Sequence, residues 1–425
     1  MNTDLSFVTG VRQTLAVVLP VRFTASAIAG WPTGPLPFEL GGRRTDAATR
    51  QTYFTPAAAR ALYGTPERPC RWHRFMDVRH ESLHLRGVEL LRTATARHPD
   101  HGLAVLHFDV EGPALLETLR AIGHRSPAAS DPLDGPLSPG VLLAGIAEPR
   151  SAAAPFAIAR PYTVAFLTPG PQHTSALRQD GRLPETADRW LWYLASRSTE
   201  ADVPTPLEQW PDRTEHALRI SADWSALVLR HGAAFLGHRA DPGGDDFYAF
   251  AQLHGRTVYL DALLLGSVQR DHIDELTDSL SGVFDGPKLA RRVSALERHI
   301  ATFRSTYWRQ HLTAHGPANE LLLSFQTQYR LAERFDEILA EAADYARLVQ
   351  TQESQQIAGA LGVLTILGLP VGTALSILQV LGAEGAVPVV VALVAALAAT
   401  ALVLTTRYGR LVLSSLRGRD PGDSR

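Results

Sequence analysis

The chain has 425 residues, a formal net charge of −2 and 45% hydrophobic residues, which together predict two or three globular domains. The near balance of acidic and basic side chains excludes an extensive basic surface, so we expect no nucleic-acid partner. The single cysteine, Cys70, excludes an internal disulfide bond and fits a reducing compartment.

Residues 1–285 predict a cytosolic domain of mixed α and β structure (α+β, with α/β-type units). Runs rich in Val and Leu at 14–23, 101–110 and 161–168 are typical of strands. Short amphipathic runs predict helices at 56–63, 114–122 and 188–196. Alternating residues on both sides of Gly232 predict a hairpin over 218–236, and 245–268 is expected to be helical. A strand followed by a helix, as at 101–122, indicates an α/β unit.

A different pattern begins at Gly286, where residues 286–356 predict a helical pair and a long stalk helix. From Pro317 the sequence has no further Gly or Pro until Gly359, which predicts one unbroken helix that continues to residue 381. Spacings of three and four form a heptad-like seam of Leu321, Ser324, Gln328, Leu331, Phe335, Ile338, Ala342, Tyr345 and Val349. The seam favours packing against the chain's own preceding parts or bundling with further copies.

Residues 357–406 carry one charged side chain, Glu384, and are long enough for two helical membrane crossings of roughly 20 residues each. We therefore expect spans at 357–381 and 387–406, joined by an outer loop at 382–388 and followed by a basic tail at 407–425. Arginines flank both spans and are absent from the loop, which predicts a multi-pass protein of the cell membrane with both termini cytoplasmic. A buried helical hairpin is the alternative.

The segment from about 289 to 410, and LTILGLPVGTALSILQVLGA above all, resembles the CorA-type metal-ion transporters. The resemblance implies a homopentamer in membrane lipid, with first spans lining a pore for divalent cations such as Mg²⁺ and no other cofactor. The family's Gly-Met-Asn motif is absent, since the only methionines are Met1 and Met76. The first hypothesis is thus a homo-oligomeric cation channel with a cytosolic regulatory domain, not an enzyme; the second is a membrane-anchored sensor or effector without transport.

Small and polar residues recur along the first predicted span, and they include Thr365, Gly372, Ser376 and Gln379. Their hydroxyl and amide oxygens could replace part of an ion's hydration shell in a pore, with Glu384 at its outer mouth. The same stripe is equally typical of close packing between helices. Glu384 is likewise typical of a solvated charge in a loop.

Three further patterns suit metal ions. His80, Glu81 and His84 match H-E-x-x-H, which on a helix binds Zn²⁺ and gives a third hypothesis, a membrane-tethered zinc protease, although the surroundings fit a strand as well. Cys70 and His73 nearby could complete a structural zinc site. Asp241, Asp245 and Asp246 could hold a regulatory cation, or form a turn that caps the next helix.

Overall fold

The computed structural model describes residues 10–24, 28, 30–40, 43–93, 95–123, 132–150, 161–170, 185–199, 201–204, 209–244, 246–314, 316–380 and 386–405. The chain divides into two compact units. The first, which we call the sheet unit, comprises Met1–Ser279 and Arg298–Ile338. The second, the helical unit, comprises Leu280–Glu297 and Leu339–Arg425. Each unit is described by itself.

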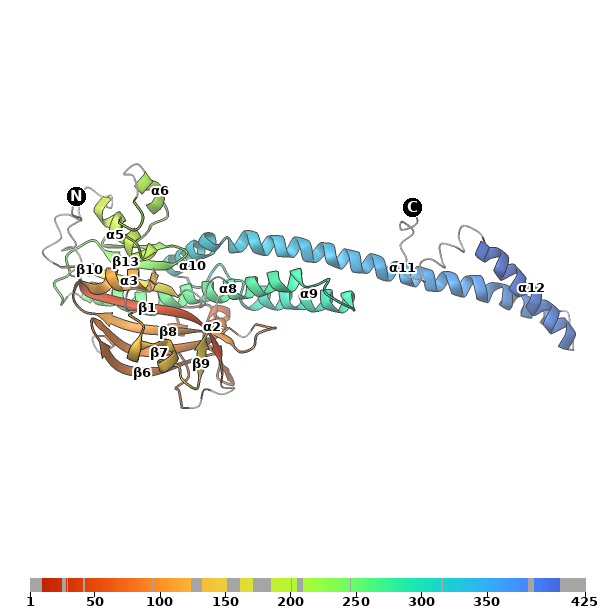
Figure 1. The fold of residues 1–425 in the computed structure, drawn as a ribbon, viewed down its shortest axis with the longest axis horizontal. Helices are drawn as coiled ribbons and strands as arrows, with labels where there is room; N and C mark the ends of the chain where they lie inside the picture. The colour runs from red at the N-terminus through yellow and green to blue at the C-terminus, as the bar shows by residue number, and fades with distance from the viewer. Residues whose placement is uncertain are drawn as a thin grey trace. The chain divides into compact units, whose positions relative to one another are not determined.

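A large sheet forms the centre of the sheet unit, in the order β11-β12-β13-β10-β1-β8-β7-β6, with β9 also paired to β1 (Figure 1). Its strands are β1 (Gly10–Phe23), β6 (Arg71–His80), β7 (Leu83–Arg92), β8 (His101–Val110), β9 (Ala147–Pro149), β10 (Tyr162–Pro169), β11 (Leu218–Ser221), β12 (Trp224–Val228) and β13 (Gly232–Gly237). Two small hairpins lie outside it, β2 (Phe38–Leu40) with β3 (Arg43–Thr45) and β4 (Gly64–Thr65) with β5 (Arg68–Pro69).

Strand β1 is central because its apolar residues are buried between two antiparallel neighbours. Leu15 lies opposite Phe108 of β8 on one side and Ala165 of β10 on the other, and all three are at most 1% exposed. Strands that are covered on both faces read as nearly continuous apolar runs, which is the pattern of β1, β8 and β10. The predicted strands at 14–23, 101–110 and 161–168 are confirmed.

Among the strands that the structure describes, only β10 and β13 pair in parallel. A parallel pair needs a long connection, and the buried helix α5 (Glu185–Ser196) lies within it. A Cβ atom at Gly232 would lie 2.8 Å from the carbonyl oxygen of Thr163 and 3.0 Å from that of Ala195, so glycine permits the close approach of β13 to both elements. The predicted hairpin around Gly232 is confirmed as β12 and β13, and the first half of the range 218–236 holds one strand more than predicted, since β11 also pairs with β12.

The other helices are α1 (Ala47–Gln51), α2 (Pro56–Tyr63), α3 (Leu115–Gly123), α4 (Pro139–Leu142), α6 (Trp210–Thr214), α7 (Asp246–Arg256), α8 (Val258–Ser281), α9 (Leu289–Thr306), α10 (Gly316–Tyr329), α11 (Leu331–Val380) and α12 (Ala386–Thr405), with 3₁₀ turns at Gly112–Ala114 and Gly135–Leu137. Helix α2 begins as predicted, because Thr55 caps it and Pro56 occupies its first turn. The fold class is confirmed at the level of a mixed domain with a large sheet and many helices.

A network of charged side chains lies inside the sheet unit and ties helices to the sheet. We call Arg50, Tyr63, Arg71, Glu89, His107 and Asp261 the buried charge network; all are at most 5% exposed. Arg71 of β6 donates from Nε to Glu89 of β7 at 2.7 Å and from Nη1 to Asp261 of α8 at 2.6 Å. Tyr63 of α2 donates to the other Asp261 oxygen at 2.7 Å, and Arg50 of α1 lies 3.4 Å from that oxygen. Mutual pairing compensates the cost of removing these charges from water.

The predicted unbroken helix from 317 to 381 is wrong at one residue, Arg330. Its φ of 52° lies in the left-handed region, which ends α10 at Tyr329 and lets α11 begin at Leu331. Neither Gly nor Asn, the residues that usually adopt this conformation, marks the break in the sequence. Helix α11 then runs for 50 residues to Val380, and Pro370 lies inside it.

The heptad-like seam packs on the chain itself. In the sheet unit, Phe335 is 2% exposed, and its ring centroid lies 5.1 Å from those of Phe303 and Trp308. In the helical unit, the ring centroid of Tyr345 lies 4.8 Å from that of Phe284. These contacts confirm the alternative of packing against the chain's own preceding parts, while bundling with further copies stays a prediction.

The two predicted membrane crossings are contradicted. Over the described residues, no helix has the combination of length and apolar character that a bilayer crossing requires. The prediction counted the absence of charge over 357–406, but the end of α11 also contains Gly, Thr, Ser and Gln as well as Pro370, which lower its apolar character. The finding also overturns the predicted placement in a cell membrane with both termini cytoplasmic.

Candidate ligand-binding pocket

A pocket of about 710 Å³ opens on the sheet unit where several elements meet. It is lined by Leu36, Pro37, Phe38, Glu39, Phe75, Met76, Asp77, Arg86, Asp109 and Arg256. The pairing of β6 with β7 shifts register between Phe75 and Val78, and such a bulge redirects side chains from the regular alternation of a strand. The bulge in β6 therefore supplies Met76 and Asp77 beside Phe75, while β2 with the segment before it, β7, β8 and α7 supply the rest.

Two arginines and one aspartate form the charged wall of the pocket. Arg256, the last residue of α7, donates from Nη2 to the carbonyl oxygen of Phe108 at 2.8 Å and pairs with the Asp109 carboxylate. Arg86 approaches the same carboxylate, with Nε 3.6 Å from Oδ2, and its side chain is 49% exposed. Two guanidinium groups share one carboxylate, so this group of three carries a net charge of about +1, and the carboxylates of Glu39 and Asp77 elsewhere in the lining bring the five charged side chains to about −1.

An apolar wall faces these charges. The Phe38 ring lies 5.2 Å from the guanidinium carbon of Arg256, within the range of a cation–π contact. Phe75 of the edge strand β6 is 61% exposed, which is high for so large an apolar side chain. Buried Leu36 and Pro37 continue the wall inward. The pocket thus combines aromatic surface with guanidinium donors.

The inner wall of the pocket is attached to the buried charge network. The backbone nitrogen of Leu36 donates to Oε1 of Glu89 at 2.9 Å, and its carbonyl oxygen accepts from Nη2 of Arg50 at 2.7 Å. The Phe38 ring lies edge-on to the His107 ring at 5.3 Å, and His107 Nε2 lies 3.1 Å from the same Glu89 oxygen. A displacement of the segment 36–38 would therefore disturb hydrogen bonds inside the network.

Electrostatics keeps the carboxylate at the centre of this network ionised. Burial alone would raise the pKa of Glu89, but the Arg71 guanidinium and the hydrogen bond from His107 outweigh it and hold the pKa well below its usual range. Burial lowers the pKa of His107 despite the neighbouring carboxylate, so the ring is neutral at pH 7 and donates through Nε2. Glu89 thus accepts hydrogen bonds from the pocket wall as a permanent anion.

The predicted zinc pair, His80 and His84, lies on a hairpin and not on a helix. His80 ends β6 opposite Leu83, whereas His84 of β7 lies opposite Arg79. Directly opposite residues share a face and successive residues alternate, so the two histidines point to opposite faces. Glu81 occupies the turn with a φ of 50°. His84 Nε2 instead bonds the exposed Asp77, and this bond lowers the pKa of the Asp77 carboxyl.

The other residues predicted to bind metal ions either bond other groups of the protein or lie apart from one another. Cys70 Sγ approaches the Ala61 carbonyl oxygen at 3.7 Å, and His73 Nδ1 bonds the Gly34 carbonyl oxygen at 2.9 Å. Asp241 is fully buried and accepts hydrogen bonds from Arg12, Thr168 and the backbone of Gly243, each at 2.8 Å. Asp246 is exposed at the start of α7, and Asp245 lies outside the described residues. Asp241 anchors the loop to β1 and β10.

The predicted pore residues Thr365, Gly372, Ser376 and Gln379 all lie in α11 and are exposed. The hydroxyls of Thr365 and Ser376 donate to carbonyl oxygens four residues earlier, each at 2.9 Å, which is the usual arrangement within a helix. Glu384 lies outside the described residues. The structure therefore assigns no ligand to this stripe.

The pocket itself escaped the sequence analysis. Three of its charged residues, Arg86, Asp109 and Arg256, stand apart in the chain and belong to no motif, so only the pairing of β7 with β8 and the end of α7 unite them. The sequence signal that was available is Phe75, an apolar residue among alternate positions that otherwise hold the polar residues His73, Asp77 and Arg79.

The chain matches no protein-family model, no curated protein and no solved structure in comparisons with each. The resemblance to CorA-type transporters, and with it the cation channel, the Mg²⁺ ion and the homopentamer, therefore stay predictions from the sequence.

Proposed function

We propose that the sheet unit is a ligand-binding regulatory domain whose pocket takes a small organic anion with an apolar ring or chain. The observation that carries this proposal is the meeting of Arg86 and Arg256 with Phe38 and Phe75 around a cavity of about 710 Å³. Small-molecule sites are typically apolar cavities of about 300–1,000 Å³ with a few polar groups that fix orientation. A carboxylate would take the guanidinium donors, and the apolar part of the ligand would cover Phe75.

The attachment of the pocket wall to the buried charge network supports a regulatory role. A ligand that packs against Phe38 contacts the segment 36–38, and the backbone of Leu36 in this segment bonds Glu89 and Arg50. Arg50 contacts Asp261 of α8 directly, and Arg71 joins Glu89 to the same Asp261, so a change at the pocket wall can reach a helix of the sheet unit through these contacts. This proposal retains the sensor of the second hypothesis without its membrane anchor.

The test is calorimetric titration of the full chain with a series of aromatic carboxylates and with the uncharged amide of each. We expect saturable binding of a carboxylate and at least tenfold weaker binding of its amide, because only the anion pairs with guanidinium. The variant Arg86→Gln should weaken carboxylate binding at least tenfold, whereas Arg74→Gln on the exposed face of β6 should leave it unchanged. Equal affinity for acid and amide, or an unaffected Arg86→Gln, would refute the proposal.

A further inference from the structure

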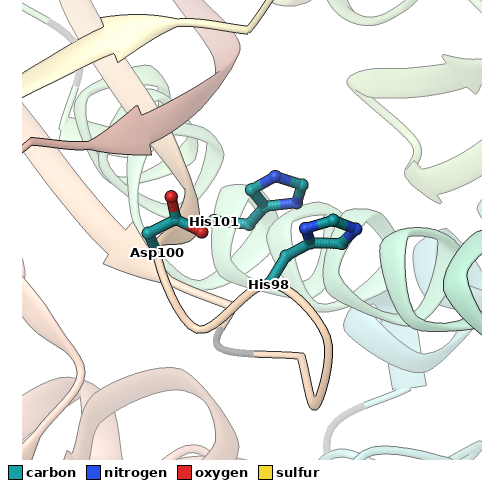
Figure 2. A group of neighbouring side chains, drawn as sticks. All are labelled: His98, Asp100 and His101. Carbon is teal, nitrogen blue, oxygen red and sulfur yellow. The ribbon is translucent and has the colours of Figure 1, made fainter.

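A second group of ligand-type side chains lies in the connection between β7 and β8. Figure 2 shows His98, Asp100 and His101 close together, with His101 at the start of β8. One ligand atom from each of the three lies within 4.8 Å of the others. Asp109 of the pocket stands eight residues along the same strand, roughly 27 Å away at the usual rise of a strand, so this group is separate from the proposed ligand site.

Backbone hydrogen bonds hold the connection in place. The carbonyl oxygen of His98 accepts from the backbone nitrogen of His101 at 3.2 Å, and that of Asp100 accepts from Phe23 at 2.7 Å. The carbonyl oxygen of His101 accepts from Thr93 at 3.1 Å. The three side chains therefore start from a fixed backbone, so a metal ion would have to order little more than the exposed ring of His98.

A buried carboxylate with an unsatisfied oxygen lies beside this connection. Glu275 of α8 is 5% exposed, and its Oε1 accepts from the backbone nitrogen of Arg97 at 2.6 Å. Its Oε2 is buried and has no hydrogen-bond partner among the described residues. A buried carboxylate oxygen without a donor is costly, and a nearby cation would relieve that cost.

Two of the three candidate ligands are paired with arginine side chains in the structure. Arg22 pairs with Asp100 through Nε at 2.9 Å, and Arg150 donates from Nη1 to Nδ1 of His101 at 3.1 Å. Arg150 also contacts Asp271 at 3.1 Å and would keep that partner if it released His101. The His98 and His101 rings stack with their centroids 4.2 Å apart, so the two imidazoles are immediate neighbours.

We infer that His98, Asp100 and His101 bind a transition-metal ion of the Zn²⁺ type, which displaces Arg150 from Nδ1 of His101. Imidazole nitrogen and carboxylate oxygen bind Zn²⁺ at about 2.0–2.2 Å, and two imidazoles exclude a preference for Mg²⁺ or Ca²⁺, which take oxygen ligands. The ligand atoms must close up from their present spacing, which the exposed His98 and the release of Arg150 allow. Glu275, whose Oε1 accepts from Arg97 and lies 3.9 Å from His299 Nδ1, adds a negative charge beside the connection.

The test is calorimetric titration of the full, chelator-treated chain with Zn²⁺, with Mg²⁺ as the comparison ion. We expect one Zn²⁺ per chain and no saturable Mg²⁺ binding at this site. The variants His98→Gln and His101→Gln should each weaken Zn²⁺ binding at least tenfold, and the exposed histidine variant His311→Gln should not. Arg150→Gln should bind Zn²⁺ more tightly, because the competing guanidinium is gone.

Replacement of Zn²⁺ by Co²⁺ gives a second readout, since the visible absorption of bound Co²⁺ depends on its imidazole ligands. The absorption should be lost in His98→Gln and His101→Gln and retained in His311→Gln, in protein whose tryptophan fluorescence shows a folded sheet unit. Absence of saturable Zn²⁺ binding, or equal binding by wild type and both ligand variants, would overturn the inference. Weaker Zn²⁺ binding by Arg150→Gln would overturn the displacement of that arginine. None of these outcomes depends on the carboxylate titration of the pocket.

Discussion

Replacement of Arg71 by methionine is the sharpest test of the buried charge network. Arg71 is fully buried and contributes hydrogen bonds to Glu89 and a 2.6 Å bond to Asp261. Without it, two buried carboxylates face the single guanidinium of Arg50, which lies 3.8 Å from Glu89 and 3.4 Å from Asp261. Removal of one partner from a buried ion pair costs about 3–5 kcal/mol, so we expect a loss of that size in the free energy of unfolding.

Urea unfolding followed by tryptophan fluorescence measures this loss, because all seven tryptophans lie within the sheet unit. The matched control is Arg74→Met, which removes an exposed arginine from the same strand and should cost less than about 0.5 kcal/mol. A loss below about 1 kcal/mol for Arg71→Met would mean that Arg71 does not hold the network together, and would refute the reasoning.

The same variant has a signature in its pH dependence. In the wild type the pKa of Glu89 is depressed, so its stabilising contribution is complete above the ordinary value of 4.5 and is lost only in strong acid. In Arg71→Met, burial without the main cation raises that pKa, and the penalty shrinks as the carboxylate takes up a proton. The difference in unfolding free energy between variant and wild type should therefore narrow from pH 7 to pH 5; a constant or widening gap would contradict the assignment.

Three further changes test other parts of the sheet unit by the same unfolding assay. Burial lowers the pKa of His272 to about 3, so the neutral ring stabilises the fold above pH 6.5 and that stability is lost as the pH falls. The variant His272→Phe should therefore remove about 2 kcal/mol of the decline in unfolding free energy between pH 7 and pH 5. An unchanged pH profile would count against this role of His272. A Cβ at Gly266 would meet the Phe325 ring at 2.5 Å, so Gly266→Ala should cost about 1–3 kcal/mol, whereas Gly244→Ala, with open space around it, should not. Arg330→Gly should stabilise the unit by about 0.5–1 kcal/mol through relief of the left-handed strain, and a loss of stability would show that the arginine side chain matters more.

Local signals in the sequence were enough to place β1, β8 and β10, because strands covered on both faces are continuous apolar runs. They also placed α2, whose Thr-Pro start is a local capping signal. The buried charge network could not be predicted in this way, since Arg50 and Asp261 are 211 residues apart and only the fold brings them together.

The failures have equally physical reasons. The H-E-x-x-H pattern suits a helix and a strand alike, and its strand pairing was visible only in the register of β6 and β7. The break at Arg330 depends on a backbone angle that arginine rarely adopts. The predicted membrane crossings rested on missing charge, which by itself does not make a helix long and apolar enough to cross a bilayer.

Within the described residues the large sheet is open: apart from a bridge between Thr33 and Trp72 at the start of β6, its two outermost strands have no further strand as neighbour. Both outer strands are irregular: the pairing of β11 with β12 slips between Arg219 and Ser221, and that of β6 with β7 slips between Phe75 and Val78. Along β6, Arg74, Asp77 and Arg79 are exposed. Kinks and charges of this kind make a poor template for an additional strand, so concentrated protein should resist fibril growth from either border of the sheet.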